Sequence, residues 1–158
     1  MIIKYIYKIG LFLLAIFMSL ALLPNLSIYL RPNLILIFLV ILLMQESFLF
    51  NLLFWFIGGI GLDIWRANIL GASSFIFIGI LILAYILSKF IDFKEKETKL
   101  ILGSFFILLY HISLFVVFRI VENIWKWNIL VNGIITLLLF IGVFFFIQRL
   151  NGNHNEKI

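Results

Sequence analysis

The sequence contains no cysteine, two prolines, two histidines and few charged residues. Asp, Glu, Lys and Arg make up 12% of the 158 residues, whereas an average soluble domain has about 25%. The absence of cysteine excludes disulfides, thiol catalysis and cysteine-ligated metal sites. The two histidines and seven acidic residues are scattered, and they form no nucleophile–base motif or metal-ligand spacing. We therefore expect no enzyme activity, no metal and no cofactor.

Apolar residues dominate the chain instead. They make up 65% of it, and phenylalanine alone occurs 19 times. The longest hydrophilic stretches, Lys89–Lys99 and Arg149–Ile158, are too short to fold alone. The positive net charge does not indicate a nucleic-acid partner, because Lys and Arg in a polytopic protein mark cytoplasmic loops. The composition predicts an all-α, polytopic integral membrane protein with a single transmembrane domain over residues 1–158.

The apolar segments predict helical spans at about 9–29, 34–44, 48–62, 69–88, 100–118 and 128–147. Most have close to the roughly 20 residues that cross a bilayer, but the second and third are short. Only Gln45–Ser47 separates these two, so one long tilted helix over 34–62 is the alternative. The first span begins like a signal peptide, with Lys4 and Lys8 before an apolar run. We interpret it as an uncleaved span because the run continues past the small residues at Ser19–Ala21.

The distribution of Lys and Arg distinguishes five spans from six. With six spans and a cytoplasmic N-terminus, eight of these residues lie inside and four outside, whereas five spans give seven against five. The positive-inside rule therefore favours about six transmembrane helices with both termini cytoplasmic. The same topology places Trp65, Trp125 and Trp127 in outer segments, where interfacial aromatic residues are expected.

Asp63 lies where the third predicted span ends, shortly after Gly58, Gly59 and Gly61. These glycines indicate close helix packing in a membrane. An acidic residue near a membrane interior is a candidate substrate or proton site. The alternative is that Asp63 caps the fourth helix or pairs with Arg66, and we favour this because Asp63 stands at a span end.

His111 is the one ionisable residue in the middle of a long predicted span. Ser104, His111 and Glu122 fall on one side of a helical projection, which is one possible proton path. The alternative is a helix contact in which the imidazole finds a hydrogen-bond partner in the last span. We favour this contact, and its expected partners are Asn128, Asn132 and Thr136.

Three short motifs follow one another between residues 31 and 71. Pro32-Asn33-Leu34 opens the second predicted span, Gly59 and Asp63 close the third as Gly-x-x-x-Asp, and Leu70-Gly71 follows. Their order and spacing, in a six-span chain of this length, resemble the MreD family, the rod shape-determining membrane proteins of bacterial cell elongation. Asn33 stands where the family more often has Asp, and the residues between Asp63 and Leu70 lack the proline that is common there.

The resemblance implies a non-enzymatic scaffold in the bacterial cytoplasmic (inner) membrane that supports cell shape and peripheral peptidoglycan synthesis. Its expected partners are membrane lipid, the bitopic protein MreC and, through MreC, MreB filaments, RodA and a penicillin-binding transpeptidase. The motif residues are then expected to matter for partner docking or for the local fold. The implied fold is similar to that of the substrate-binding components of energy-coupling-factor vitamin transporters.

A vitamin-binding component of such a transporter is the alternative function, because it shares the size, span count and orientation. These components use small residues in the first span to contact their energising partner, and Ala15-x-x-x-Ser19 has that pattern. Trp65, Asn68 and Asn128 are the residues that would gather around an outward-facing pocket.

Overall fold

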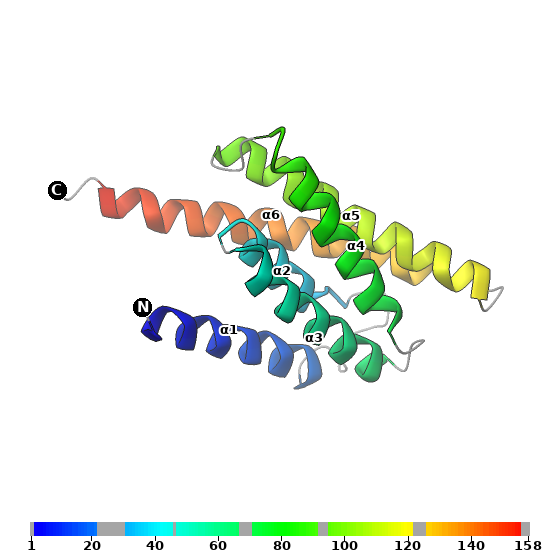
Figure 1. The fold of residues 1–158 in the computed structure, drawn as a ribbon. Coiled ribbons are helices and arrows are strands. Elements are labelled where there is room, and N and C mark those ends of the chain that lie inside the picture. Colours follow the sequence, from blue (N-terminus) through cyan, green and yellow to red (C-terminus); the bar gives the residue numbers. More distant parts are fainter. Residues whose placement is uncertain are drawn as a thin grey trace.

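The computed structural model describes residues 2–21, 31–45, 47–66, 71–91, 95–121 and 126–155. Within these ranges the regular secondary structure is entirely helical, as the sequence predicts (Figure 1). The helices are α1 (Ile2–Ala21), α2 (Leu34–Leu43), α3 (Phe48–Arg66), α4 (Ala72–Leu87), α5 (Lys96–Val121) and α6 (Trp127–Asn155).

The helices alternate in direction along the chain. In Figure 1 the start of α1, the turn between α2 and α3, the end of α4 and the end of α6 lie toward the left of the bundle. The starts of α2, α4 and α6 lie away from that side. The bundle therefore has two distinct ends, and each described connection lies at one of them.

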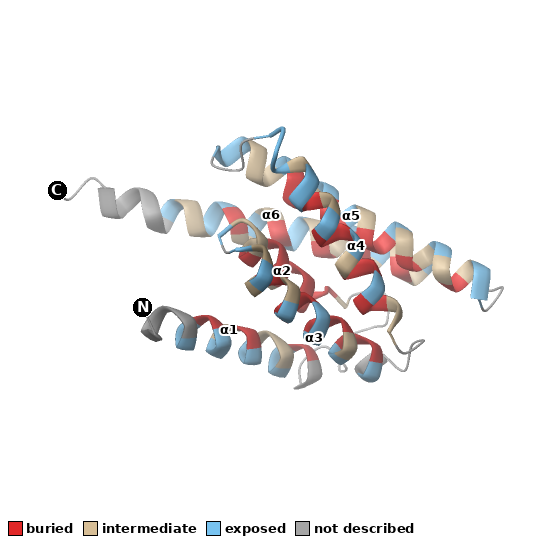
Figure 2. Cartoon of the chain, in the orientation of Figure 1, coloured by how far each residue is buried: buried red, intermediate tan, exposed pale blue. Residues whose placement is uncertain are grey.

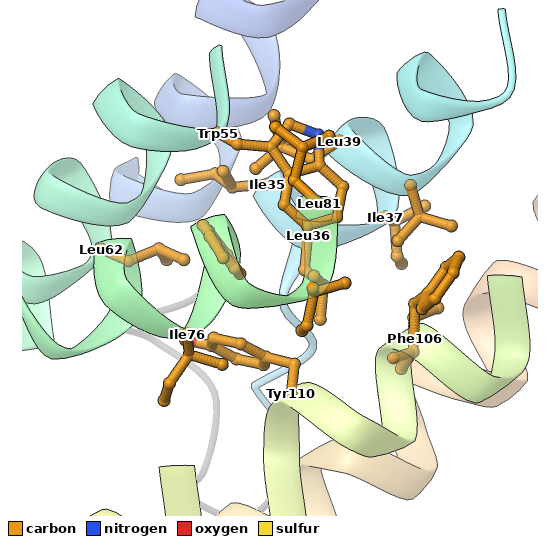
Figure 3. Close-up of a cluster of buried hydrophobic side chains, with 14 of the residues drawn as sticks. Ile35, Leu36, Ile37, Leu39, Trp55, Leu62, Ile76, Leu81, Phe106 and Tyr110 are labelled. Carbon is orange, nitrogen blue, oxygen red and sulfur yellow. The ribbon is translucent and has the colours of Figure 1, made fainter. Parts of the chain in front are cut away.

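The short helix α2 forms the centre of the bundle. It contacts α1, α3, α5 and α6, and most of its side chains are buried (Figure 2). Figure 3 shows Leu36 and Leu39 of α2 within the cluster that also contains Trp55 of α3 and Tyr110 of α5. A helix of 10 residues rises about 15 Å, which is half of the roughly 30 Å of hydrocarbon in a bilayer.

The turn after α2 decides whether residues 34–62 form one helix or two. Met44 and Gln45 form a turn in which the Gln45 N–H donates to the Leu42 carbonyl at 3.0 Å. The segment 34–62 is therefore two helices and not one long helix.

The outer surface of the bundle is apolar. Large hydrophobic side chains are exposed on five helices, for example Phe17, Leu49, Phe75, Ile101 and Leu138. A soluble monomer rarely exposes apolar patches larger than a few hundred Å². By length and composition, α5 and the Trp127–Arg149 part of α6 are suited to cross a membrane, and α1 to α4 contain shorter apolar segments.

Several helix ends differ from the predicted bounds. The first helix begins at Ile2 and not at 9, and the last continues to Asn155 past 147. Both extensions contain polar or basic residues, which mark the edge of a hydrocarbon layer but do not end helical hydrogen bonding. α5 likewise extends beyond 100–118 at both ends. The predicted end of the first span, and residues 67–70 before α4, lie outside the described ranges.

Candidate functional site: capped helix starts inside the bundle

Asn33 occupies the N-cap position of α2 and is 2% exposed. Its side-chain oxygen Oδ1 accepts a hydrogen bond from the backbone N–H of Leu36 at 3.0 Å. The first N–H groups of a helix have no partner within the helix, and Asn is among the preferred residues to supply one. The sequence motif at this point is therefore a helix cap.

Two side chains of α6 serve the same helix start. The backbone N–H of Asn33 donates to Thr136 Oγ1 at 2.9 Å, and that of Arg31 donates to Asn132 Oδ1 at 3.1 Å. Thr136 Oγ1 in turn donates to the Asn132 carbonyl at 2.7 Å. Buried backbone donors are costly when unpaired, so α6 stabilises a chain entry that lies inside the protein.

Asp63 caps the start of α4 from the end of α3. Both of its carboxyl oxygens lie 3.1 Å from the backbone N of Ser73, the second residue of α4. Asp63 is 1% exposed. The predicted cap on the fourth helix is therefore confirmed. The predicted alternative, a pair with Arg66, involves a side chain that lies outside the described part of the chain.

Gly71 stands directly before α4 with a φ of 91°, in the left-handed region. Glycine adopts this conformation at no steric cost, whereas an L side chain there is strained. Gly71 thus shapes the entry into α4, while Asp63 accepts the buried N–H of Ser73 in its first turn. Leu70, the other residue of this motif, lies outside the described residues.

Gly59 allows α3 and α4 to touch through their backbones. A Cβ atom at this position would lie 2.5 Å from Cα of Ser74, which is too close for any side chain. Ser74 Oγ also donates to the Phe56 carbonyl at 3.2 Å. Gly58 packs too, against α2 and α1, but Gly61 has open space where its Cβ would be. Packing therefore explains two of the three glycines, because the helical turn points the third one outward.

Tyr110 extends the site from α4 to α5. Its hydroxyl lies within hydrogen-bond distance of Ser73 Oγ, at 3.0 Å. Ser73 therefore contacts Asp63 of α3 through its backbone and Tyr110 of α5 through its side chain. Tyr110 is fully buried, with its ring 4.8 Å from that of Phe77. Sequence reasoning missed this contact because a lone tyrosine in an apolar run carries no sign of its partner.

His111 marks the crossing of α5 and α6. Its ring packs on Gly133, where a Cβ would lie 2.9 Å from Cγ of the histidine. His111 Nδ1 lies 2.9 Å from the carbonyl oxygen of Ile107 in its own helix. The predicted helix contact is present, but this hydrogen bond is made within α5 and not with the Asn132 and Thr136 row. Those two side chains hold the start of α2, a use that their helical spacing did not reveal.

The structure therefore gives several of the predicted motif residues a role in capping or packing helices. Asn33 caps α2, Asp63 caps α4, and Gly59 lets α3 contact α4. The chain neighbours of Asn33 are Pro32, which is buried, and Leu34, which is partly buried. Within the described ranges, Nδ2 of Asn33 is buried without a hydrogen-bond partner. No group of three or more His, Cys, Asp or Glu side chains in those ranges is placed to hold a metal ion.

No protein-family model, curated protein or solved structure gives a significant match to this chain.

Proposed function

We propose that this chain is a non-enzymatic membrane scaffold of the MreD type, which supports cell shape and peripheral peptidoglycan synthesis through an MreC-like partner. The observation that carries the proposal is the shared role of Asn33, Gly59 and Asp63. Of these three positions of the MreD-like motif, Asn33 caps α2, Gly59 lets α3 contact α4, and Asp63 caps α4. Residues in these roles stabilise a fixed arrangement of helices, which is what a scaffold requires.

The proposed topology has six transmembrane segments and cytoplasmic termini in the bacterial inner membrane. The alternating helix directions support it, because the ends rich in Lys and Arg in the sequence lie toward one end of the bundle. The apolar outer surface also supports it, since lipid would face the side chains exposed there. The caps on α2 provide hydrogen-bond partners for a helix that starts at membrane depth, where unpaired backbone groups are not tolerated.

The burial of the motif has a consequence for partner binding. Asn33 and Asp63 are at most 2% exposed, so they act on a partner through the bundle that they hold together. The partner itself meets the outer surface. In the proposal a single helix of an MreC-like protein packs against exposed apolar side chains of this surface, as helices do in membranes through close packing.

Co-purification tests the proposal. The tagged chain is extracted from its own cell membranes in mild detergent, and the proteins that accompany it are identified. Recovery of an MreC-like protein, RodA or the transpeptidase is the expected result. Recovery of a transport ATPase pair with its membrane coupler would instead assign the chain to vitamin uptake and refute the scaffold.

A matched pair of variants adds a second readout. Gly59→Ala disturbs the α3–α4 contact, whereas Gly61→Ala adds a methyl group where space is open. We expect Gly59→Ala to lower the amount of folded chain and of recovered partner in the same proportion, and Gly61→Ala to leave both unchanged. Loss of partner from fully folded Gly59→Ala protein would place the partner at the motif itself.

A further inference from the structure

A cavity of about 170 Å³ lies between the end of α2, the start of α3 and the end of α4. It is at the end of the bundle opposite the capped helix starts, near the turn between α2 and α3. Leu43 and Phe48 contribute apolar walls, and Asn51, Tyr85 and Ser88 contribute polar groups. A water molecule occupies roughly 30 Å³ of liquid, so the cavity has room for a group of several heavy atoms.

The polar side chains of this cavity make hydrogen bonds to nearby backbone carbonyls. Asn51 is 1% exposed, and its Nδ2 donates to the Ser47 carbonyl at 3.2 Å. Ser88 Oγ donates to the Tyr85 carbonyl at 2.7 Å. Lys89 places its Nζ 5.1 Å from the centre of the Tyr85 ring, beside the cavity. The Asn51 and Ser88 side chains already donate within the protein, so it is the Lys89 ammonium, beside the Tyr85 ring, that can pair with an anionic group at this end of the helix pair.

An apolar groove lies on the same pair of helices. Its volume is about 350 Å³, and it is lined by Leu49, Leu52, Leu53 and Phe56 of α3 with Ile78 of α4. No polar side chain lines it. Leu49 and Phe56 are seven positions apart, which corresponds to about 10 Å along the helix axis. The paired rings of Phe48 and Tyr85, with centres 5.0 Å apart, join the two helices near the polar cavity.

We propose that this α3–α4 seam binds one anionic phospholipid. The phosphate group pairs with Lys89 near the Tyr85 ring, and one acyl chain lies in the groove beside Ile78. A charged rim next to a groove of hydrocarbon matches the two parts of such a lipid, and basic pockets between helices on the cytoplasmic side bind anionic headgroups. The inference depends on the membrane placement given under the proposed function, but it does not require an MreC-like partner.

Native mass spectrometry of the full chain in mild detergent tests the site. The probes are phosphatidylglycerol, phosphatidylcholine with the same acyl chains, and inorganic phosphate. We expect one phosphatidylglycerol to bind about fivefold more tightly than phosphatidylcholine, the factor that corresponds to ~1 kcal/mol for one lysine at an anionic surface. Lys89→Ala should abolish this preference. Lys126→Ala, which removes a lysine beside the Phe118 ring in another part of the bundle, should retain it.

A second pair of variants tests the groove. Ile78→Trp fills the groove and should weaken the binding of both lipids at least threefold, whereas Ile134→Trp on the exposed face of α6 should have no effect. Equal affinity of the native protein for the two lipids would refute the proposal. Binding of inorganic phosphate as tight as that of phosphatidylglycerol would also refute it and would define a site for small anions. Lipid preference without recovery of an MreC-like protein would sustain the site and reject the scaffold.

Discussion

Replacement of Asp63 by alanine removes the acceptor for the backbone N–H of Ser73, which lies inside the protein. The two contacts of 3.1 Å involve a single N–H group and therefore count as one hydrogen bond. A hydrogen bond to a charged group contributes about 1.5–3 kcal/mol, and an acidic side chain at a helix N-terminus adds about 0.3–1 kcal/mol. We expect Asp63→Ala to lower the free energy of unfolding by about 2–4 kcal/mol.

Equilibrium unfolding in mixed micelles measures this loss, with increasing SDS as the denaturant. Trp55 is fully buried and makes an edge contact with Phe77, so its fluorescence reports on the core between α3 and α4. Asp63→Asn retains an oxygen acceptor and should lose only about 1 kcal/mol. Glu97→Ala is the control, because Glu97 is an exposed acid in the first turn of α5, and its loss should stay below ~1 kcal/mol.

A change of less than ~0.5 kcal/mol for Asp63→Ala, the size of an ordinary surface substitution, would refute the capping argument. The buried carboxyl group would then have little role in stability, and a substrate or proton site would become the better interpretation of Asp63.

Two further predictions concern the other contacts of the site. Gly59→Ala should destabilise the bundle by about 1–3 kcal/mol through overpacking against Ser74. Gly61→Ala, with open space at its Cβ, should be neutral or slightly stabilising. Equal unfolding curves for the two variants would contradict the close contact at Gly59. Thr136→Val keeps the side-chain shape but removes the acceptor for the N–H of Asn33, so it should cost about 1–3 kcal/mol in the same unfolding assay, and Thr136→Ser should recover most of this loss.

The sequence predicted the helices better than their contacts. The second span was expected at 34–44 and is Leu34–Leu43, because Asn33 is a preferred cap and the apolar run stops at a polar turn. The cap that Asp63 makes on α4 was also predicted, because this acid stands at a span end, although the N-cap position itself is held by Gly71. The hydrogen bond between Asn33 and Thr136 could not be predicted, because it joins residues that are 103 positions apart and no periodicity connects them.

The helix bounds show the same limit. The charges of Lys4 and Lys8 suggested that the first helix starts after them, but α1 includes both and Lys8 is only 7% exposed. Charge locates the boundary of a hydrocarbon layer, whereas a helix continues for as long as its backbone bonds are made. The role of Ser73 and Tyr110 likewise depends on which faces of α4 and α5 meet, and this is a property of the folded bundle.

The cap on α2 has a consequence for how the chain is made. Asn132 and Thr136 lie about a hundred residues after the segment that they hold, so they leave the ribosome only after α2 to α5 have been synthesised. Until α6 arrives, the start of α2 lacks these two partners, and the centre of the bundle is completed last. Any truncation before α6 should therefore yield a chain in which the start of α2 lacks the acceptors of Asn132 and Thr136.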